Sequence, residues 1–256
     1  MRNLLKLIIY RVLYSIKLKL IKNKFEMSYS DNNIFITGAN SGIGLGLTHK
    51  FLELNNRVFA TYKDNCENLA KINNKNLILI KCNQKNLNEI KDIKSKINNI
   101  PINLIINNAG IWGPKEQSFK TLNFKTFQDI MMVNSLSVIK IAQVILDSTV
   151  KNSLKMIVNI SSDGGSIQRN NFGNFYMYRT SKTALNAITK NMAIDLLKSN
   201  NIIVFALHPG EVKSKLNPGG ALGADECANL IVKLIVNKGK DLNGKFVDLL
   251  NNEIPW

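Results

Sequence analysis

The chain has 256 residues, of which 45% are hydrophobic and 20% are charged. That length suits one α/β domain with a full core and is short for two, and the composition excludes a disordered polymer. The net charge of +16 is compatible with binding to nucleic acid, to an anionic membrane or to an anionic small ligand. No Arg-rich stripe and no interleaved basic and aromatic pattern is present, so we expect no nucleic-acid partner.

The cysteines and histidines do not form a pattern typical of a metal site. The three cysteines, Cys66, Cys82 and Cys227, are widely spaced, and no CxxC pair occurs. The two histidines, His49 and His208, add no metal constellation. We therefore predict no metal ion, no disulfide framework and a reducing, cytoplasmic location.

Residues 1–26 differ from the rest of the chain because they combine apolar residues with seven basic residues and one acidic residue. Arg11 and Lys17 interrupt the apolar stretch, which is then too short to span a bilayer, and no clean signal-peptide core is present. Three interpretations stay open: a peripheral helix on an anionic membrane, an organelle-targeting presequence, or an extension ahead of Met27. We favour the extension or the peripheral anchor, and predict a basic apolar extension over residues 1–30 and one folded domain over residues 31–256.

From Asn33 onward, short apolar runs alternate with segments in which apolar residues recur every three or four positions. Seven strands that alternate with helices predict a single Rossmann-type, doubly wound α/β domain, with a seven-stranded, mainly parallel sheet and helices on both faces. Ligands of such a domain bind beyond the carboxyl ends of the strands. The expected strands cover residues 34–37, 57–62, 77–81, 102–107, 155–160, 202–207 and 245–249, and the main expected helices cover residues 42–54, 87–97, 126–150, 176–199 and 224–237.

A glycine-rich turn, TGANSGIG at residues 37–44, follows the first strand and opens the first helix. We expect Gly38 to permit the sharp turn, Gly42 to let the backbone approach a pyrophosphate, and Gly44 to let helix and strand pack closely. The helix N-terminus adds free N–H groups and a partial positive charge. An ordinary glycine-rich loop also fits this motif alone, because its spacing is Gly-x-x-x-Gly-x-Gly rather than Gly-x-Gly-x-x-Gly.

Three further motifs follow later strands. They are NNAG at residues 107–110, Ser162 after the fifth strand, and the pair Tyr178 and Lys182. Because this pair is four residues apart, both side chains lie on one face of a helix. Each motif alone has an ordinary explanation as a turn, a helix cap or a chance recurrence. Their order, each at a strand end, indicates one shared site.

Together these motifs resemble the short-chain dehydrogenase/reductase family from about Asn33 to the C-terminus. The matching segments are TGANSGIG at 37–44, NNAG at 107–110, Asn134 in MVNSLSV, Ser162, YRTSK at 178–182 and HPG at 208–210. Within the family the chain looks most similar to the C-factor and sniffer-type carbonyl reductases. That finer resemblance rests on YRTSKTALN at 178–186, ALHPGEVKS at 206–214 and IPW at 254–256.

The resemblance implies a catalytic tetrad of Asn134, Ser162, Tyr178 and Lys182. Ser162 is expected to hold and polarise a carbonyl oxygen, and Tyr178 to donate the proton in reduction or accept it in oxidation. Lys182 is expected to lower the pKa of Tyr178 and to hydrogen-bond the nicotinamide ribose. In the family, the position of Asn134 supports a water that links the lysine to solvent.

The resemblance also implies a dinucleotide cofactor, NADP with NAD as the alternative. Lys63 follows the second strand, where a cation suits a 2′-phosphate, whereas Ser41 replaces a basic residue common in the NADP-preferring subgroup, and Asp64 keeps NAD open. The expected cofactor contacts are Gly38, Asn40, Ser41, Gly42, Ile43, Gly44, Lys63, Asn83, Asn108, Ala109, Gly110, Tyr178, Lys182, Pro209, Gly210, Val212 and Ser214.

The leading hypothesis is an NADPH-dependent reductase that passes hydride to a small-molecule carbonyl, or the reverse with an alcohol. The alternative is a cofactor-binding signalling or regulatory protein of the C-factor type with little catalysis. A third hypothesis is a peripheral membrane enzyme that acts on lipophilic carbonyls and contacts the membrane through residues 1–26. The family commonly forms homodimers through the two long helices, expected here at residues 126–150 and 176–199.

Overall fold

The computed structural model describes residues 29–213 and 219–256. Its sheet has seven strands in the order β3-β2-β1-β4-β5-β6-β7, and each neighbouring pair is parallel. The predicted doubly wound fold is confirmed, with a sheet that is parallel throughout. The elements are β1 (Asn33–Ile36), α2 (Gly42–Glu53), β2 (Arg57–Tyr62), α3 (Glu67–Ala70), β3 (Leu77–Lys81), α4 (Leu87–Ile97), β4 (Leu104–Asn107), α5 (Phe124–Met131), η1 (Met132–Leu136), α6 (Ser137–Ser148), β5 (Met156–Ile160), η2 (Asp163–Gly165), α7 (Tyr176–Asn200), β6 (Ile203–His208), α8 (Ala224–Lys238), η3 (Gly239–Asp241) and β7 (Phe246–Asp248).

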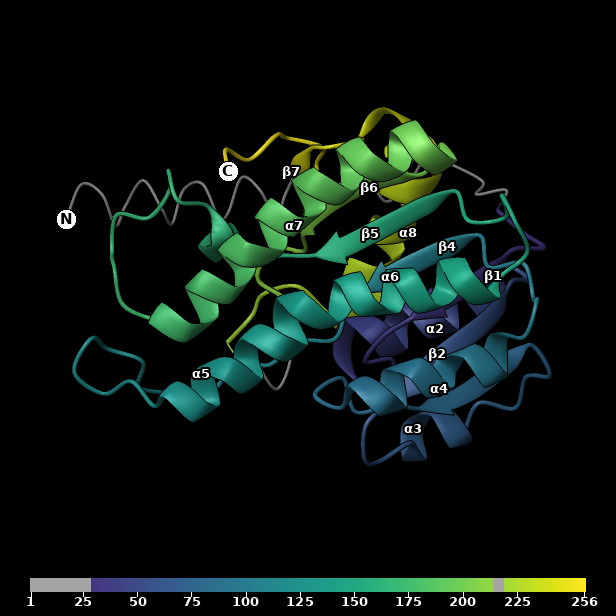
Figure 1. Cartoon of the computed structure of the whole chain (residues 1–256), viewed down its shortest axis with the longest axis horizontal. Helices are drawn as coiled ribbons and strands as arrows, with labels where there is room; N and C mark the ends of the chain where they lie inside the picture. The colour runs from purple at the N-terminus through teal and green to yellow at the C-terminus, as the bar shows by residue number, and fades with distance from the viewer. Residues whose placement is uncertain (1–28, 214–218) are drawn as a thin grey trace.

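Helices cover both faces of the sheet. In Figure 1, α4, α6 and α7 lie in front of the sheet, while α2 and α8 lie behind it and pack against each other. Each face has its own core, with Phe51 of α2 and Ile231 of α8 buried on one side and Ile93 of α4 and Ile145 of α6 on the other. Strands that are buried on both faces must be apolar throughout, which is why every residue of β4 is buried.

The helix expected over residues 126–150 differs from the observed one. It begins at Phe124, because the Asn123 side chain accepts a hydrogen bond from the backbone N–H of Thr126 and caps the first turn. In its middle, Met132–Leu136 form a π-helical turn with one extra residue per turn. The whole run is long and apolar enough to cross a membrane, but half of its most apolar window is buried in the domain, as in a core helix. The short helix α3 was not predicted.

The order of the strands in the sheet determines where a ligand-binding cleft forms. The chain runs from β1 outward through β2 to β3, then crosses back to β4 on the other side of β1. The loops that follow β1 and β4 therefore separate, and this reversal is where ligands bind in such sheets. In Figure 1 the arrow of β5 points toward the end where the loop before α5 and the loop before α7 project.

The predicted extension over residues 1–30 lies almost wholly outside the described residues, so that domain division stays a prediction.

Candidate active site

A cleft of about 1160 Å³ opens at the carboxyl ends of the strands. Its walls come from the loops after β1, β2, β3, β4, β5 and β6, so residues far apart in the sequence meet there. Of the predicted cofactor contacts, Gly44 does not line the cleft and Ser214 lies outside the described residues. Those that line it are Gly38, Asn40, Ser41, Gly42, Ile43, Lys63, Asn83, Asn108, Ala109, Gly110, Tyr178, Lys182, Pro209, Gly210 and Val212.

The glycine-rich turn is built without room for side chains. Gly38 has a positive φ of 63°, which favours glycine. A Cβ on Gly44 would lie 2.3 Å from the Gly38 carbonyl oxygen and 2.5 Å from Nδ2 of Asn108. That Asn108 amide donates to the carbonyls of Thr37 and Gly38 at 2.9 and 3.1 Å. The loops after β1 and β4 are thereby joined, and Gly44 contributes by close packing.

The N-terminus of α2 faces this turn, and no side chain of the N-cap residue caps its first backbone N–H groups. Ser41 occupies the N-cap position but its side chain makes no capping hydrogen bond, and the first turn contains no acidic residue. The first N–H groups of a helix lack intrahelical acceptors, and together with the helix dipole they favour an anion. Because no Cβ fills the cradle at Gly38 and Gly42, the residues present fit a dinucleotide pyrophosphate.

The far end of the cleft carries the residues expected at the adenosine. Lys63 Nζ lies 3.1 Å from Asp64 Oδ2, and both side chains are exposed. Such an exposed pair is weak, so Lys63 can exchange it for a phosphate. The Asn83 Oδ1 atom accepts from the backbone N–H of Lys85 at 3.2 Å.

Ser162, Tyr178 and Lys182 meet in the middle of the cleft. The Ser162 hydroxyl caps η2 by accepting from the backbone N–H of Gly164 at 3.1 Å, and it donates to Asp163 Oδ1 at 3.3 Å. Lys182 Nζ lies 5.9 Å from the centroid of the Tyr178 ring and donates to the Ile160 carbonyl at 2.8 Å. The spacing of Tyr178 and Lys182 thus does place both on the cleft side of α7.

Burial sets the protonation of this pair. Burial raises the pKa of Tyr178 to about 12, which the Asp163 carboxylate reinforces and a hydrogen bond with Ser162 opposes. Burial lowers the pKa of Lys182 to about 8. Lys182 is not among the causes of the Tyr178 shift, so the expectation that it lowers the pKa of Tyr178 stays a prediction.

Asn134 lies in the π-helical turn and outside the cleft wall. Its Oδ1 atom accepts from the backbone N–H of Ile111 at 2.8 Å, and its Nδ2 atom donates to the Ile111 carbonyl and to Ser181 Oγ, each at 2.9 Å. The side chain therefore holds the loop after β4 against α7. A water-linking role at this position stays a proposal.

An aromatic wall closes the substrate end of the cleft. The Trp112 ring lies 4.3 Å from the Tyr178 ring and 5.2 Å from the Phe175 ring, measured between centroids. Sequence reasoning missed Gln117, which is fully buried beneath this wall. No sequence pattern distinguishes a buried glutamine in a loop from a solvated one.

Comparison with known proteins agrees with this architecture. A family model described as short chain dehydrogenase matches residues 32–220. The chain is 27% identical over 157 residues to the protein named C-signal of Myxococcus xanthus, covering 61% of this chain and 93% of that protein. It is 30% identical over 250 residues to Short chain dehydrogenase gsfK of Penicillium aethiopicum, covering 87% and 98%.

Two solved structures of carbonyl reductases superpose closely on the fold. The Carbonyl reductase Sniffer of D. melanogaster has a TM-score of 0.80 at 30% identity, covering 88% of this chain and 100% of that one. The NADPH bound carbonyl reductase from chicken fatty liver has a TM-score of 0.79 at 28% identity, covering 89% and 100%. This chain therefore belongs to the short-chain dehydrogenase/reductase family, as an oxidoreductase of the C-factor and sniffer type.

Proposed function

We propose that this oxidoreductase is an NADPH-dependent carbonyl reductase whose tetrad is Asn134, Ser162, Tyr178 and Lys182. The observation that carries the proposal is the meeting of the Ser162 hydroxyl, the Tyr178 phenol and the Lys182 ammonium in one cleft with the glycine-rich turn. A binding module has no need of these three groups together. The carbonyl reductase from chicken fatty liver, which is similar to this chain, is described as NADPH bound.

In reduction, Ser162 holds the carbonyl oxygen and Tyr178 supplies the proton. The cofactor, when bound, supplies the hydride. The Ser162 hydroxyl exchanges its long bond to Asp163 for the substrate oxygen, and so stabilises the charge that develops there. A Tyr178 pKa of about 12 keeps the phenol protonated at neutral pH, which is the state that a proton donor requires. Lys182 Nζ has two N–H groups besides the one directed at Ile160, and we assign one of these to the nicotinamide ribose.

The test is the absorbance of NADPH and NADH with the full chain and a panel of aldehydes, ketones and quinones. We expect the wild type to oxidise NADPH, and Tyr178→Phe to lower kcat by about 1,000-fold, since a positioned proton donor contributes about 10² to 10⁴. Binding of NADPH to the variant should be unchanged in a fluorescence titration. Undiminished turnover in the variant would rule out the mechanism. Binding of NADPH without consumption by the wild type would favour the regulatory alternative.

We assign the choice of NADPH to Lys63. Lys63→Ala should reduce kcat/KM for NADPH by about tenfold and leave kcat/KM for NADH unchanged, because only NADPH carries the 2′-phosphate that the ammonium meets. Lys71→Ala, at an exposed lysine after α3, is the matched control and should change neither. An equal loss with both cofactors would show that Lys63 does not select between them.

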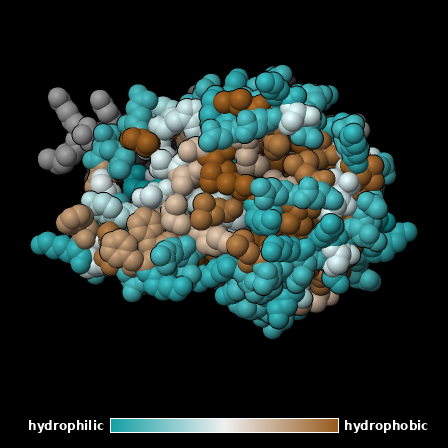
Figure 2. All heavy atoms as spheres, in the orientation of Figure 1, coloured by the Kyte–Doolittle hydropathy of each residue, from teal (hydrophilic) through white to brown (hydrophobic). Residues whose placement is uncertain are grey.

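We further propose that lipophilic carbonyls reach the cleft from an anionic membrane surface. The support is a group of exposed aromatic side chains on the loops before α5 and α7 and at the first residue of α5. They are Phe119, Phe124 and Phe172, which are 76%, 72% and 82% exposed. Figure 2 shows hydrophobic side chains gathered at the lower left, over the start of α7. Exposed lysines accompany them at Lys115, Lys120 and Lys125, and apolar groups with basic neighbours suit anionic lipid.

Sedimentation with vesicles tests this membrane contact. The full chain should pellet with phosphatidylserine-containing vesicles and not with neutral ones, and a Phe119→Ser/Phe172→Ser variant should bind several-fold more weakly with its turnover of water-soluble carbonyls unchanged. Deletion of residues 1–26, which lie outside the described residues, separates the contribution of the N-terminal segment. Absence of binding by the full chain would remove the proposal.

A further inference from the structure

Gln117 lies in the loop between β4 and α5, and its side chain is fully buried. Burying an amide is costly unless its donors and acceptor are all paired. Its Nε2 atom donates to the carbonyls of Trp112 and Pro114 at 2.8 and 3.0 Å. Its Oε1 atom accepts from the backbone N–H of Tyr178 at 3.0 Å. One carboxamide therefore connects the loop after β4 with the start of α7.

Helix α7 depends on this contact because it has no cap of its own. The N-cap residue Phe175 makes no side-chain capping bond and has a left-handed backbone, with a φ of 49°, which is unusual for a bulky residue. The first N–H groups of the helix need acceptors from elsewhere. Gln117 supplies two of them, since its backbone carbonyl accepts from the N–H of Tyr176 at 3.2 Å and its Oε1 atom accepts from Tyr178.

The other half of the carboxamide fixes the aromatic wall. The chain turns at Gly113, which has a φ of 90° and no space for a Cβ, because Ile130 Cδ1 would lie 2.5 Å away. Nε2 of Gln117 holds the carbonyls on both sides of this turn. The Trp112 ring is thereby kept 4.3 Å from the ring of Tyr178, the residue whose backbone the same carboxamide holds.

We propose that Gln117 is a positioning residue, which caps α7 from a distant loop and so sets Tyr178 and Trp112 in one fixed arrangement at the substrate end of the cleft. The proposal rests on the proposed reductase function for its kinetic consequence, but not for its structural one. Gln117 itself touches neither the cleft nor the reacting atoms; it acts through the backbone of Tyr178 and the loop that carries Trp112.

Two substitutions separate the two halves of the carboxamide. Gln117→Met keeps the size of the side chain and removes the three hydrogen bonds of the carboxamide, while the backbone carbonyl still accepts from Tyr176. Gln117→Glu keeps an acceptor for the Tyr178 N–H, at a helix terminus that favours negative charge, and gives up at least one of the donors to Trp112 and Pro114. Asn56→Leu is the matched control. Asn56 is also fully buried, and its Nδ2 atom donates to the carbonyls of Tyr29, Phe51 and Leu54.

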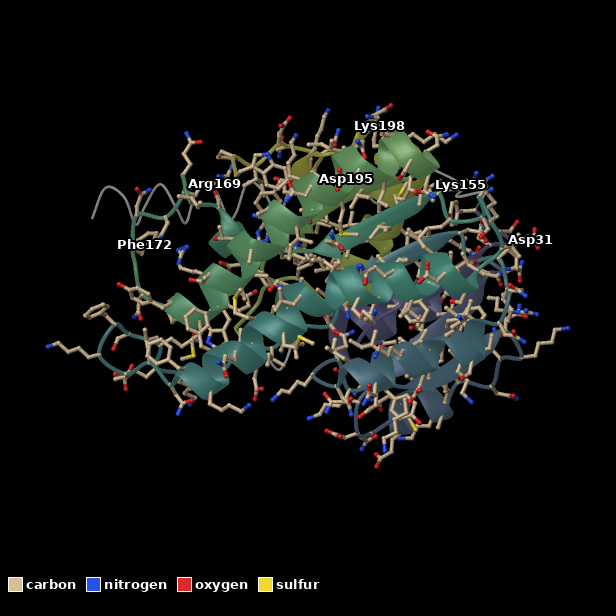
Figure 3. All side chains as sticks on the ribbon, viewed as in Figure 1. Asp31, Lys155, Arg169, Phe172, Asp195 and Lys198 are labelled. Atoms are coloured by element: carbon tan, nitrogen blue, oxygen red, sulfur yellow. The ribbon has the colours of Figure 1, made fainter. Side chains whose placement is uncertain are left out.

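The control lies at the other end of the sheet. Oδ1 of Asn56 accepts from the backbone N–H of Asn32, next to Asp31, and Figure 3 shows Asp31 at the end opposite to Phe172. Loss of a buried amide there lowers stability without reaching the cleft. If the Gln117 and Asn56 variants are folded to the same extent but differ in emission or kinetics, the difference therefore reflects where the lost amide lies and not how much stability is lost.

The first readout is the emission of Trp112 without cofactor or substrate. The chain has two tryptophans, so Trp256→Phe leaves Trp112 as the sole reporter. In that background we expect Gln117→Met and Gln117→Glu to shift the emission to longer wavelength, as the loop releases Trp112 to water, and Asn56→Leu to leave it unchanged. An unshifted emission in folded Gln117→Met would overturn the proposal.

The second readout is steady-state kinetics with NADPH and the best carbonyl of the panel. Both Gln117 variants should raise KM for the carbonyl, and Gln117→Met should lower kcat by about 10- to 100-fold, the loss that a small misplacement of a reacting group produces. Gln117→Glu should keep most of kcat because α7 keeps its cap. Equal kinetic losses in Asn56→Leu would show that Gln117 acts only through stability and does not position the site. A wild type without turnover would refute the reductase function alone, since the emission still tests Gln117.

Discussion

Two side chains in the cleft, the buried Lys182 and the half-buried Tyr178, make stability depend on pH in opposite directions. Lys182 has a folded-state pKa of about 8, below its ordinary value of 10.5. Between these two values the unfolded chain holds a proton that the folded chain has lost, so rising pH favours the folded state. Tyr178 has a folded-state pKa of about 12, above its ordinary value of 10.0. Above pH 10 the folded chain holds the extra proton, and rising pH then favours unfolding.

A comparison with Lys182→Met isolates the lysine, because Tyr178 is present in both proteins. From pH 8 to pH 10 the free energy of unfolding of the wild type should rise relative to the variant, by on the order of 2 kcal/mol for a shift of this size. Urea unfolding at several pH values measures it. Parallel curves over this range would mean that Lys182 is not desolvated as the fold indicates.

At the scale of elements, the junction of β1 and α2 depends on the absence of one methyl group. Ala is a better helix former than Gly by about 1 kcal/mol, so Gly44→Ala in an open helix would stabilise. Here the new Cβ would lie 2.3 Å from a backbone oxygen, and overpacking should cost about 2 kcal/mol and weaken NADPH binding. Gly223→Ala, whose Cβ would meet only Glu226 at 4.0 Å, should be neutral in urea unfolding and in the NADPH titration. A Gly44→Ala variant as stable as the wild type would show that helix and strand can separate.

The elements that the sequence predicts well are those with strong periodicity or continuous apolar runs. The strands of the central sheet and helices such as α4, with Ile90, Ile93 and Ile97 on its buried face, follow directly from the pattern. The glycine turn and the pair Tyr178 and Lys182 are local, so their spacing was sufficient to place them. The π-helical turn, the occupied amide of Asn134 and the cap by Gln117 depend on contacts between distant segments, which spacing does not encode.

At the scale of the whole molecule, the outer surface of the long helices carries large apolar side chains that are exposed to water. The exposed apolar residues are Leu136 at the end of η1, Ile139 of α6, and Ile194 and Leu197 of α7. Exposed apolar side chains of this kind are typical of interfaces, and a twofold pairing of identical copies is the commonest arrangement. We therefore propose a homodimer through these helices.

The dimer is tested by an Ile194→Glu/Leu197→Glu variant in analytical ultracentrifugation. The wild type should sediment as a dimer and the variant as a monomer, because two carboxylates cannot be buried at an apolar contact without partners. Lys71→Glu, at an exposed lysine after α3 on the side of the molecule away from α7 in Figure 1, is the charge-matched control and should stay dimeric. A monomeric wild type would contradict the proposal.

The π-helical turn at Met132–Leu136 has a consequence for changes in chain length. Ile130 before it and Ile141 after it are both buried, and the wider turn accommodates its extra residue locally. Deleting one residue here would convert the π-helical turn to a regular α-helical turn and leave the segments on either side on their present faces. The change would fall on the turn itself, where Asn134 would lose its place opposite Ile111. A deletion of one residue here would therefore disturb the site while the cores on either side stay buried, unlike a deletion in a regular helix, which rotates every residue beyond it by about 100°.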